Sequence, residues 1–387
     1  MTAIRGVAVV GVGETGYYKR GTSPDGEHML TLRAVLAACD EAGVDPRDLD
    51  GFASYGHDRN DGTKLAASLG VRDLKWTTMV WGGGGGGIAA AIAAAAAAVM
   101  SGQAENVIVS RALAERTSGR LGAAVSAEFM NAHYRSAGII SPAQNVALRC
   151  QRMFEYDGVP RSTQKAVAQA GYHHAQTNPR AFGRGTILDD ATYDSSRWIA
   201  EPFRLFDCSR ENDGAAALLF TSTARADSLA KQPVHLIAAG GSKRADWGEI
   251  LDNDEDYTSS GFKAVAPRIW QATGLGPEDI DVVQVYENFT GAAVGSLIDH
   301  GFCTAENAGE VLTLENLIAP SGGLPINTSG GNVGEGFVHG IGLAVEAVRQ
   351  IRGESCNQVP GARHSMLLGG PGDIFVSSAL FADHELT

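Results

Sequence analysis

The chain contains two internal repeats in the same order, and this duplication is the feature that most constrains its fold. In the first pair, AGVDPRDLDGF (42–52) and TGLGPEDIDVV (273–283), four of eleven positions are identical and two more exchange one aliphatic residue for another. Each stretch combines a glycine suited to a helix C-cap, a proline turn and an apolar segment. The second pair is a glycine turn followed by a long helical segment, ending at Gly102 in one half and Gly353 in the other. Two pairs in the same order indicate a duplicated α/β unit.

Apolar and helical segments alternate along the first half. We expect strands at 6–13, 50–56, 76–82 and 106–112 and helices at 29–42 and 88–100, which predicts a parallel sheet with helices on its faces. A long excursion, 111–200, is rich in small and polar residues, as are segments that supply the walls of a binding site. A strand at 215–221 follows it. We place the domain boundary after residue 228, which gives halves of 1–228 and 229–387.

The composition excludes several classes of function. A net charge of −13 argues against binding to nucleic acid or to anionic membranes. The longest apolar run, 88–100, has 13 residues and is too short to span a bilayer, and the N-terminus lacks the pattern of a signal peptide. The five cysteines are scattered, and no histidine has a metal-ligand partner at suitable spacing, so we predict no metal site. Sparse, unpaired cysteines indicate a reduced, cytoplasmic protein.

The stretch MVWGGGGGGIAAAIAAAAAAVM (79–100) is the most unusual in the chain. Its glycines either cradle a phosphate or oxyanion, or serve as packing residues from which a reactive side chain has been lost. A dinucleotide-binding loop needs an acidic residue at the end of the next strand, but that strand ends in Ser110 and Arg111. A GxxxxGK[ST] motif is also absent. Nucleotide binding is therefore disfavoured.

Tyr286, Glu287 and Asn288 stand in VQVYENFTG (283–291), where an apolar strand ends and a helix begins. Ligand sites gather at the ends of parallel strands, so these residues are candidates for a binding or catalytic site. In the alternative interpretation, Glu287 and Asn288 only cap the helix and Tyr286 packs in the core. The sequence leaves both interpretations open.

Glu335 and His339 stand in GGNVGEGFVHG (330–340), four residues apart, which predicts that they share one face of a helix. Backbone N–H groups at the glycine-led start of that helix, near Gly331, would suit an oxyanion, and His339 would move protons. The alternative is that His339 is a buried structural histidine.

These motifs together resemble the thiolase superfamily. The segments YENFT (286–290), LPINTSGGNVGEGFVHG (324–340) and SRWIAEPFRLFDCSRENDGAAALL (196–219) are most similar to its lipid-transfer-protein branch, which is related to the sterol carrier protein X thiolases. The resemblance covers essentially the whole chain. It implies an α/β fold in which two duplicated βαβαβαββ halves form a five-layered αβαβα core, and it implies a homodimer formed through the core sheet.

The groups that a thiolase needs for acyl transfer are replaced in this chain. The resemblance puts the nucleophilic cysteine at about Gly85 and the second cysteine at about Leu367. The histidine of the GHP motif corresponds to Phe337, and the asparagine or histidine of the NEAF or HDCF motif corresponds to Tyr286. A covalent acyl-enzyme is therefore not expected.

Actinobacterial steroid side-chain aldolases belong to the same branch and lack the cysteine. They cleave a β-hydroxyacyl-CoA steroid by a retro-aldol reaction to a ketone and propionyl-CoA, with a tyrosine at the position of Tyr286. A second tyrosine of theirs corresponds to Phe337, which has no hydroxyl, so Tyr286 with His339 or Glu335 would carry the proton transfers. The resemblance implies a carbon–carbon lyase; the alternative is a non-catalytic acyl-CoA-binding or structural subunit.

The resemblance also implies the remaining components of the site. The coenzyme A thioester is the substrate, and no bound cofactor is expected. The accessory partner would be a small zinc-ribbon/OB-fold protein that helps to build the substrate site. The residues assigned to substrate binding are Gly85, Asn288, Gly331, Phe337 and, in the excursion, Tyr134.

Overall fold

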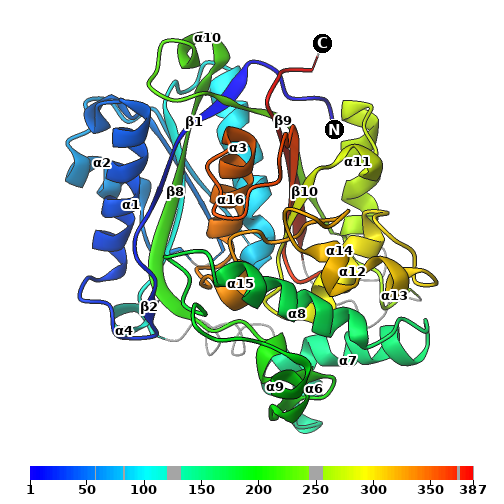
Figure 1. The fold of residues 1–387 in the computed structure, drawn as a ribbon. Coiled ribbons are helices and arrows are strands. Elements are labelled where there is room, and N and C mark those ends of the chain that lie inside the picture. Colours follow the sequence, from blue (N-terminus) through cyan, green and yellow to red (C-terminus); the bar gives the residue numbers. More distant parts are fainter. Residues whose placement is uncertain (57, 82, 120–131, 244–255, 373–374, 387) are drawn as a thin grey trace.

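The computed structural model describes residues 1–56, 58–81, 83–119, 132–243, 256–372 and 375–386 (Figure 1). The first half contains β1 (Val7–Glu14), β2 (Tyr18–Lys19), α1 (Glu27–Ala42), β3 (Gly51–Tyr55), α2 (Gly62–Leu69), β4 (Trp76–Val80), α3 (Ile88–Met100), β5 (Val107–Leu113) and β8 (Asn212–Ser222). The second half contains β9 (Val234–Ser242), α11 (Phe262–Thr273), β10 (Val282–Val285), α12 (Thr290–Asp299), α16 (Ile341–Arg352), β11 (His364–Gly369) and β12 (Val376–Ala382).

Shorter elements fill the excursion and the loops. They are α4 (Glu115–Ser118), α6 (Ala132–Ser136), α7 (Pro142–Glu155), α8 (Ser162–Ala175), α9 (Asp190–Ser195), β6 (Trp198–Ala200), β7 (Phe203–Arg204), α10 (Thr223–Ala226), α13 (Ala308–Val311), α14 (Leu314–Leu317) and α15 (Gly331–Gly334). Single 3₁₀ turns are η1 (Pro46–Asp48), η2 (Gly84–Gly87), η3 (Leu205–Asp207) and η5 (Pro277–Asp279). No helix in the described part of the chain is both long and apolar enough to cross a membrane.

The strand pairings confirm the internal duplication. The first half has the order β1-β8-β5-β3-β4, and the second half repeats it as β9-β12-β11-β10. Both halves pair their outer strands in parallel and their inner strands antiparallel, so the sheet is mixed and the prediction of a parallel sheet is wrong for the inner strands. The counterpart of β4 in the second half is reduced to one parallel bridge between Val283 and Ile326. Since β1 and β9 also pair with each other, the sheet is continuous from one half to the other. The domain boundary after residue 228 stays a prediction.

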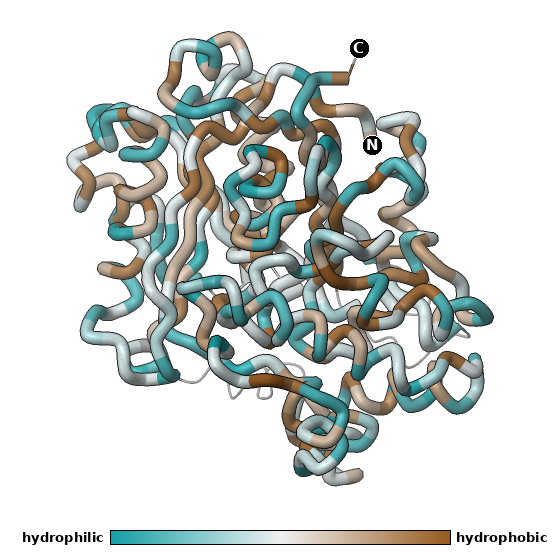
Figure 2. The backbone as a smooth tube through the Cα atoms, viewed as in Figure 1, coloured by the Kyte–Doolittle hydropathy of each residue, from teal (hydrophilic) through white to brown (hydrophobic). Residues whose placement is uncertain are grey.

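The two halves of the sheet enclose a central pair of helices. Figure 1 shows α1 and α2 outside the first half, α3 and α16 between the halves, and α11 and α12 outside the second half, which gives the predicted five layers. Hydrophobic segments follow the strands between these layers (Figure 2).

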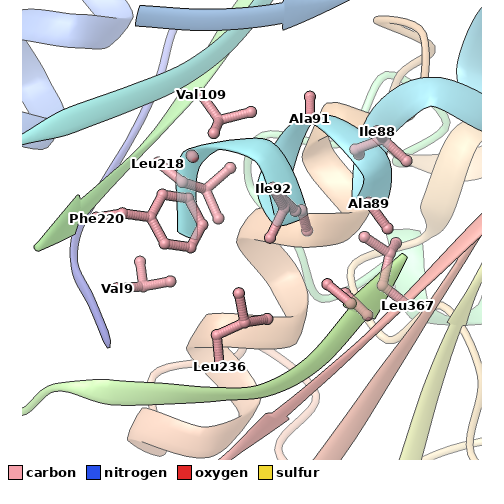
Figure 3. Packing of buried hydrophobic residues seen from close by; sticks show 14 of the residues in the cluster. Val9, Ile88, Ala89, Ala91, Ile92, Val109, Leu218, Phe220, Leu236 and Leu367 are labelled. Atoms are coloured by element: carbon pink, nitrogen blue, oxygen red, sulfur yellow. The ribbon is translucent and has the colours of Figure 1, made fainter. Parts of the chain in front are cut away.

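The alanine run explains how α3 fits at the centre. Its residues are buried on nearly all sides, and small side chains allow a helix to lie close to both halves of the sheet. In Figure 3, Ile88 and Ile92 of α3 pack among side chains from both halves, which include Phe220 and Leu236.

The predicted helix of the second repeat is shorter than expected. Only Ile341–Arg352 is a long helix, and the segment before it consists of the short α15 and an irregular turn. Gly340 has a φ of 86° and His339 a φ of 55°, both in the left-handed region that interrupts a helix. The prediction that Glu335 and His339 share a helical face is therefore wrong.

Candidate active site

The ring of Tyr286 lies directly against Gly85, where the glycine run turns into α3. A Cβ atom at Gly85 would lie 2.2 Å from Cε2 of Tyr286 and 2.5 Å from its hydroxyl oxygen. On another side of the ring, a Cβ atom at Gly340 would lie 2.7 Å from Cδ2 of Tyr286. The tyrosine is 2% exposed. Two glycines, one from each half of the chain, thus make the space that this ring fills.

The remaining glycines of the run allow β12 and the segment before it to approach the start of α3. Ser377 of β12 donates a hydrogen bond to the carbonyl oxygen of Gly86 (2.5 Å) and accepts one from the N–H of Ala89 (2.9 Å). A Cβ atom at Gly86 would lie 1.8 Å from the carbonyl oxygen of Phe375. The packing interpretation of the glycine run is therefore supported at Gly85 and Gly86.

His339 lies in a turn and is held from two sides. Its Nδ1 lies 3.2 Å from Nε of Arg111, and its carbonyl oxygen accepts a hydrogen bond from the hydroxyl of Tyr55 (2.9 Å). The guanidinium N–H only donates, so Nδ1 of His339 is the acceptor. The proton of the neutral imidazole is therefore on Nε2, and the ring offers a donor there.

Phe337 lies between Tyr286 and His339. Its ring centre is 6.1 Å from each of theirs, and both ring pairs have T-shaped geometry. Its backbone forms hydrogen bonds in both directions with Asn212, at the start of β8. The structure thus brings together four predicted site residues from three distant segments: Gly85, Tyr286, Phe337 and His339.

Glu335 lies in a different environment, a buried cluster of charges. Its carboxylate accepts a hydrogen bond from the side-chain amide of Asn178 (2.7 Å) and lies 3.3 Å from the guanidinium of Arg180, which also faces Glu14. Burial, together with the nearby carboxylate of Glu14, raises the pKa of Glu335 to about 7. These contacts do not bring Glu335 to Tyr286, and its predicted role in proton transfer gains no support from them.

The glycine-led start of α15 already holds a carboxyl group from the protein itself. The carboxylate of Glu287 accepts hydrogen bonds from the N–H of Val333 (3.3 Å) and the side chain of Asn332 (3.0 Å). A Cβ atom at Gly331 would lie 1.9 Å from Oε1 of Glu287. The place that we assigned to a substrate oxyanion at Gly331 is therefore filled by Glu287. Burial raises the pKa of this carboxyl group to about 8.

Asn288 and Tyr134, the two other residues assigned to substrate binding, are partly buried. The carbonyl oxygen of Asn288 accepts a hydrogen bond from the N–H of Ser209, and its side-chain oxygen is buried without a hydrogen-bond partner. Tyr134 lies on α6. A role in substrate binding stays a prediction for both.

Sequence reasoning missed Arg111 and Tyr55. Arg111 was noted only because it stands where a dinucleotide fold would need an acid. Its position at the carboxyl end of a buried strand was a usable signal, because an arginine is rarely buried without a specific partner.

Among the described residues, no group of three or more histidine, cysteine, aspartate or glutamate side chains could hold a metal ion.

Comparison with known proteins decides the family. Residues 244–381 match the family model of thiolase C-terminal domain-like proteins. The chain is also 34% identical to the 17-hydroxy-3-oxo-4-pregnene-20-carboxyl-CoA lyase of Mycobacterium tuberculosis, over 94% of this chain and 96% of that protein. The chain belongs to the thiolase superfamily. Within it, this thiolase-like chain lies in the lipid-transfer-protein branch, since it is also 33% identical to a steroid side-chain-cleaving aldolase of Thermomonospora curvata, over 94% of this chain and 95% of that one.

Solved structures agree with the fold of this thiolase-like chain. The Ltp2-ChsH2(DUF35) aldolase superposes with a TM-score of 0.91 at 32% identity, covering 99% of this chain and 100% of that one. Human mitochondrial 3-ketoacyl-CoA thiolase superposes with a TM-score of 0.70 at 13% identity, covering 98% of this chain and 99% of that one, a likeness of fold alone. The predicted thiolase fold is confirmed.

Proposed function

We propose that the chain is a carbon–carbon lyase that cleaves a bulky, steroid-like β-hydroxyacyl-CoA by a retro-aldol reaction. The observation that carries this proposal is the contact between Tyr286 and Gly85, because a phenol occupies the place of the thiolase nucleophile. The names of the lyase and aldolase relatives, each similar over almost the whole chain, support the same reaction class. The products would be a ketone and a short acyl-CoA such as propionyl-CoA.

The reaction needs only proton transfers and charge stabilisation. The β-hydroxyl group loses its proton and becomes the ketone as the Cα–Cβ bond breaks. The electrons of that bond move into the thioester, which becomes an enolate and then takes up a proton at Cα. Atoms and electrons balance without an oxidant, a reductant or a bound cofactor, so the coenzyme A thioester is the substrate and nothing further is required.

The site suggests a division of roles between two side chains. Tyr286 would exchange protons with the substrate through its hydroxyl group, which lies at the start of the central helix α3. His339 would donate from Nε2 to the developing enolate oxygen, because a neutral imidazole with Nδ1 occupied offers a donor and not a base. The ring of Phe337 would form an apolar wall between them.

We extend the proposal to assembly and location. A small zinc-ribbon/OB-fold accessory protein and a homodimer are proposed, and the name of the Ltp2-ChsH2(DUF35) aldolase supports the accessory protein. All five cysteines are free thiols, which supports a cytoplasmic location. Co-expression with the candidate accessory protein and light scattering would test both parts of the assembly.

The test is turnover of a 17-hydroxy steroid side-chain CoA thioester by the full chain with its accessory protein. Chromatography should show a steroid ketone and propionyl-CoA in equal amounts. Tyr286→Phe should lower kcat by about 10²-fold or more, the usual contribution of a positioned acid or base. Tyr156→Phe is the matched control, because Tyr156 is 70% exposed. Unchanged turnover in Tyr286→Phe would disprove the site assignment.

A second candidate function is a non-catalytic acyl-CoA-binding or structural subunit. Phe337 favours it, because this residue lacks the hydroxyl group that the resemblance leads us to expect. Calorimetry showing tight binding of the thioester, with no product in the presence of the accessory protein, would support this second function over the lyase.

A further inference from the structure

Arg111 is one of the largest fully buried side chains of the described structure. It lies on β5, is 1% exposed and is surrounded by polar groups. Its Nη1 donates to the carbonyl oxygen of Ala112 (2.7 Å) and its Nη2 donates to that of Gly56 (3.0 Å). The third donor position, Nε, faces Nδ1 of His339 at 3.2 Å. The guanidinium group is therefore fixed in orientation by partners on each of its nitrogens.

Two carboxylates compensate the buried charge. Asp58 lies 3.5 Å and Glu27 lies 3.7 Å from Nη1 of Arg111, and their side chains are 1% and 7% exposed. A buried cation needs such partners, because the cost of removing it from water is large. With both carboxylates on Nη1, the Nε–H group remains directed at the imidazole. Arg111 therefore stays charged while it donates to His339.

We infer that Arg111 is a positioning residue that holds His339 as the neutral tautomer with its proton on Nε2. The tautomer with its proton on Nδ1 would place an N–H group against the Nε–H group of Arg111, and rotation of the ring would place a C–H group there. Protonation of Nδ1 in a charged imidazole would place two cations at hydrogen-bond distance. The hydrogen bond from Tyr55 to the carbonyl oxygen of His339 fixes the backbone as well. His339 thus acts as a hydrogen-bond donor and not as the base.

The same geometry predicts how His339 responds to pH. Among the described residues, the charged or titratable groups around it are Arg111 and Tyr55, with Asp58 and Glu27 behind Arg111 and Tyr286 beyond the ring of Phe337. The guanidinium of Arg111 lies 3.2 Å from Nδ1 of the imidazole. We expect the imidazole to stay neutral over the range in which an ordinary histidine titrates.

The donor role follows from this tautomer and from the proposed function. In a retro-aldol cleavage the thioester oxygen becomes an enolate, and a fixed N–H group directed at it stabilises the transition state. The catalytic part of the inference rests on the proposed lyase activity, whereas the tautomer of His339 does not. The two parts are therefore tested separately.

The first experiment measures the tautomer directly in the full chain. Nitrogen-15 spectra of protein labelled at histidine report which ring nitrogen carries the proton, and a His339→Gln variant assigns the signal. The expected result is a proton on Nε2 and no titration between about pH 6 and 8. A proton on Nδ1, or an ordinary titration in the wild-type chain, would overturn the inference whatever the activity.

The second experiment removes the guanidinium group. Arg111→Met should lower kcat by about 10²-fold with little change in KM, the size of effect found when one oxyanion donor is lost. The His339 signal should begin to titrate, and added guanidinium ion should partly restore kcat. If Arg111→Met does not fold, Arg111→Lys replaces it, because lysine keeps the buried positive charge. Arg111→Lys should also have a lower kcat than the wild-type chain.

Arg352→Met is the matched control for these variants. Its side chain is also 1% exposed and ion-paired, to Glu41, but it lies at the far end of α16. If Arg352→Met lowers kcat as much as Arg111→Met, the effect of Arg111 is structural and the positioning role is lost. If the tautomer is as expected and no thioester is cleaved, the proposed function fails while the assignment of His339 stands.

Discussion

The phenol ring of Tyr286 occupies the space into which any side chain at Gly85 would project. Cε2 and Cζ of the tyrosine lie 2.2 and 2.3 Å from the position of a Cβ atom there. Real Cβ atoms do not approach other carbons so closely, because van der Waals contact begins near 3.5 Å. A thiolase-type nucleophile at Gly85 and the observed position of Tyr286 therefore exclude each other.

Gly85→Ala is expected to destabilise the protein and to abolish turnover. The added methyl group must displace the ring of Tyr286, and overpacking a close-packed site costs about 1–3 kcal/mol. Chemical denaturation would measure the loss in the free energy of unfolding. Gly16→Ala is the matched control, because a Cβ atom at Gly16 would meet nothing within 4 Å.

A double variant tests whether Tyr286 causes that loss. Gly85→Ala combined with Tyr286→Ala should be less destabilised than the sum of the two single variants, because the contacting ring is absent. Coupling between residues in contact is typically about 0.5–3 kcal/mol. Additive losses would show that the added methyl group acts on some other neighbour.

Phe337→Tyr is expected to increase turnover of the steroid thioester. The new hydroxyl group would stand on a ring that contacts both Tyr286 and His339, and it would supply the proton donor that the resemblance leads us to expect. Acid–base groups contribute about 10²-fold or more when well placed, so we expect kcat to rise by at least about tenfold. Steady-state measurement of kcat and KM for both proteins tests this prediction. A fall in kcat would mean that Phe337 is needed as an apolar wall.

Glu287 should make the stability of the fold depend on pH. Burial raises its pKa to about 8, so the folded state keeps a proton that the unfolded chain loses near the ordinary value of 4.5. The stabilisation is complete below 4.5 and is lost as the pH rises through about 8. We expect the free energy of unfolding to fall by about 2 kcal/mol between about pH 6 and 9. Glu287→Gln should flatten this slope, and equal slopes in urea titrations of both proteins would contradict the assignment.

Thr290 should stabilise the attachment of η3, the turn that follows the excursion, to the second half. Its hydroxyl group donates to Asp207 (2.6 Å), which also accepts from Tyr193. Burial raises the pKa of Asp207 to about 6, although these donors lower it. Thr290→Val removes one donor at nearly constant volume and should cost about 1–3 kcal/mol of unfolding free energy. Thr304→Val, at an exposed position, is the control and should cost much less.

Local patterns were sufficient for much of the fold. The alternation of apolar and helical segments predicted β1, β3, β4 and β5 within two residues and β8 within three, because side-chain periodicity is set by backbone geometry. The two-residue strand β2 was not predicted. The helix expected before Gly353 was predicted too long. The five glycines in positions 330–340 disfavour a helix more strongly than the four-residue spacing of Glu335 and His339 favours one.

The sequence by itself determined the duplicated architecture, the likeness to thiolases and the loss of every thiolase cysteine. These follow from residue identity and order, which need no coordinates. Only the tertiary structure decided that Glu335 belongs to a charge cluster, that Glu287 fills the start of α15 and that Arg111 fixes His339. Arg111 and His339 are 228 residues apart. Contacts over such distances depend on how the two halves of the sheet close around α3 and α16, and that packing has no local signature in the chain.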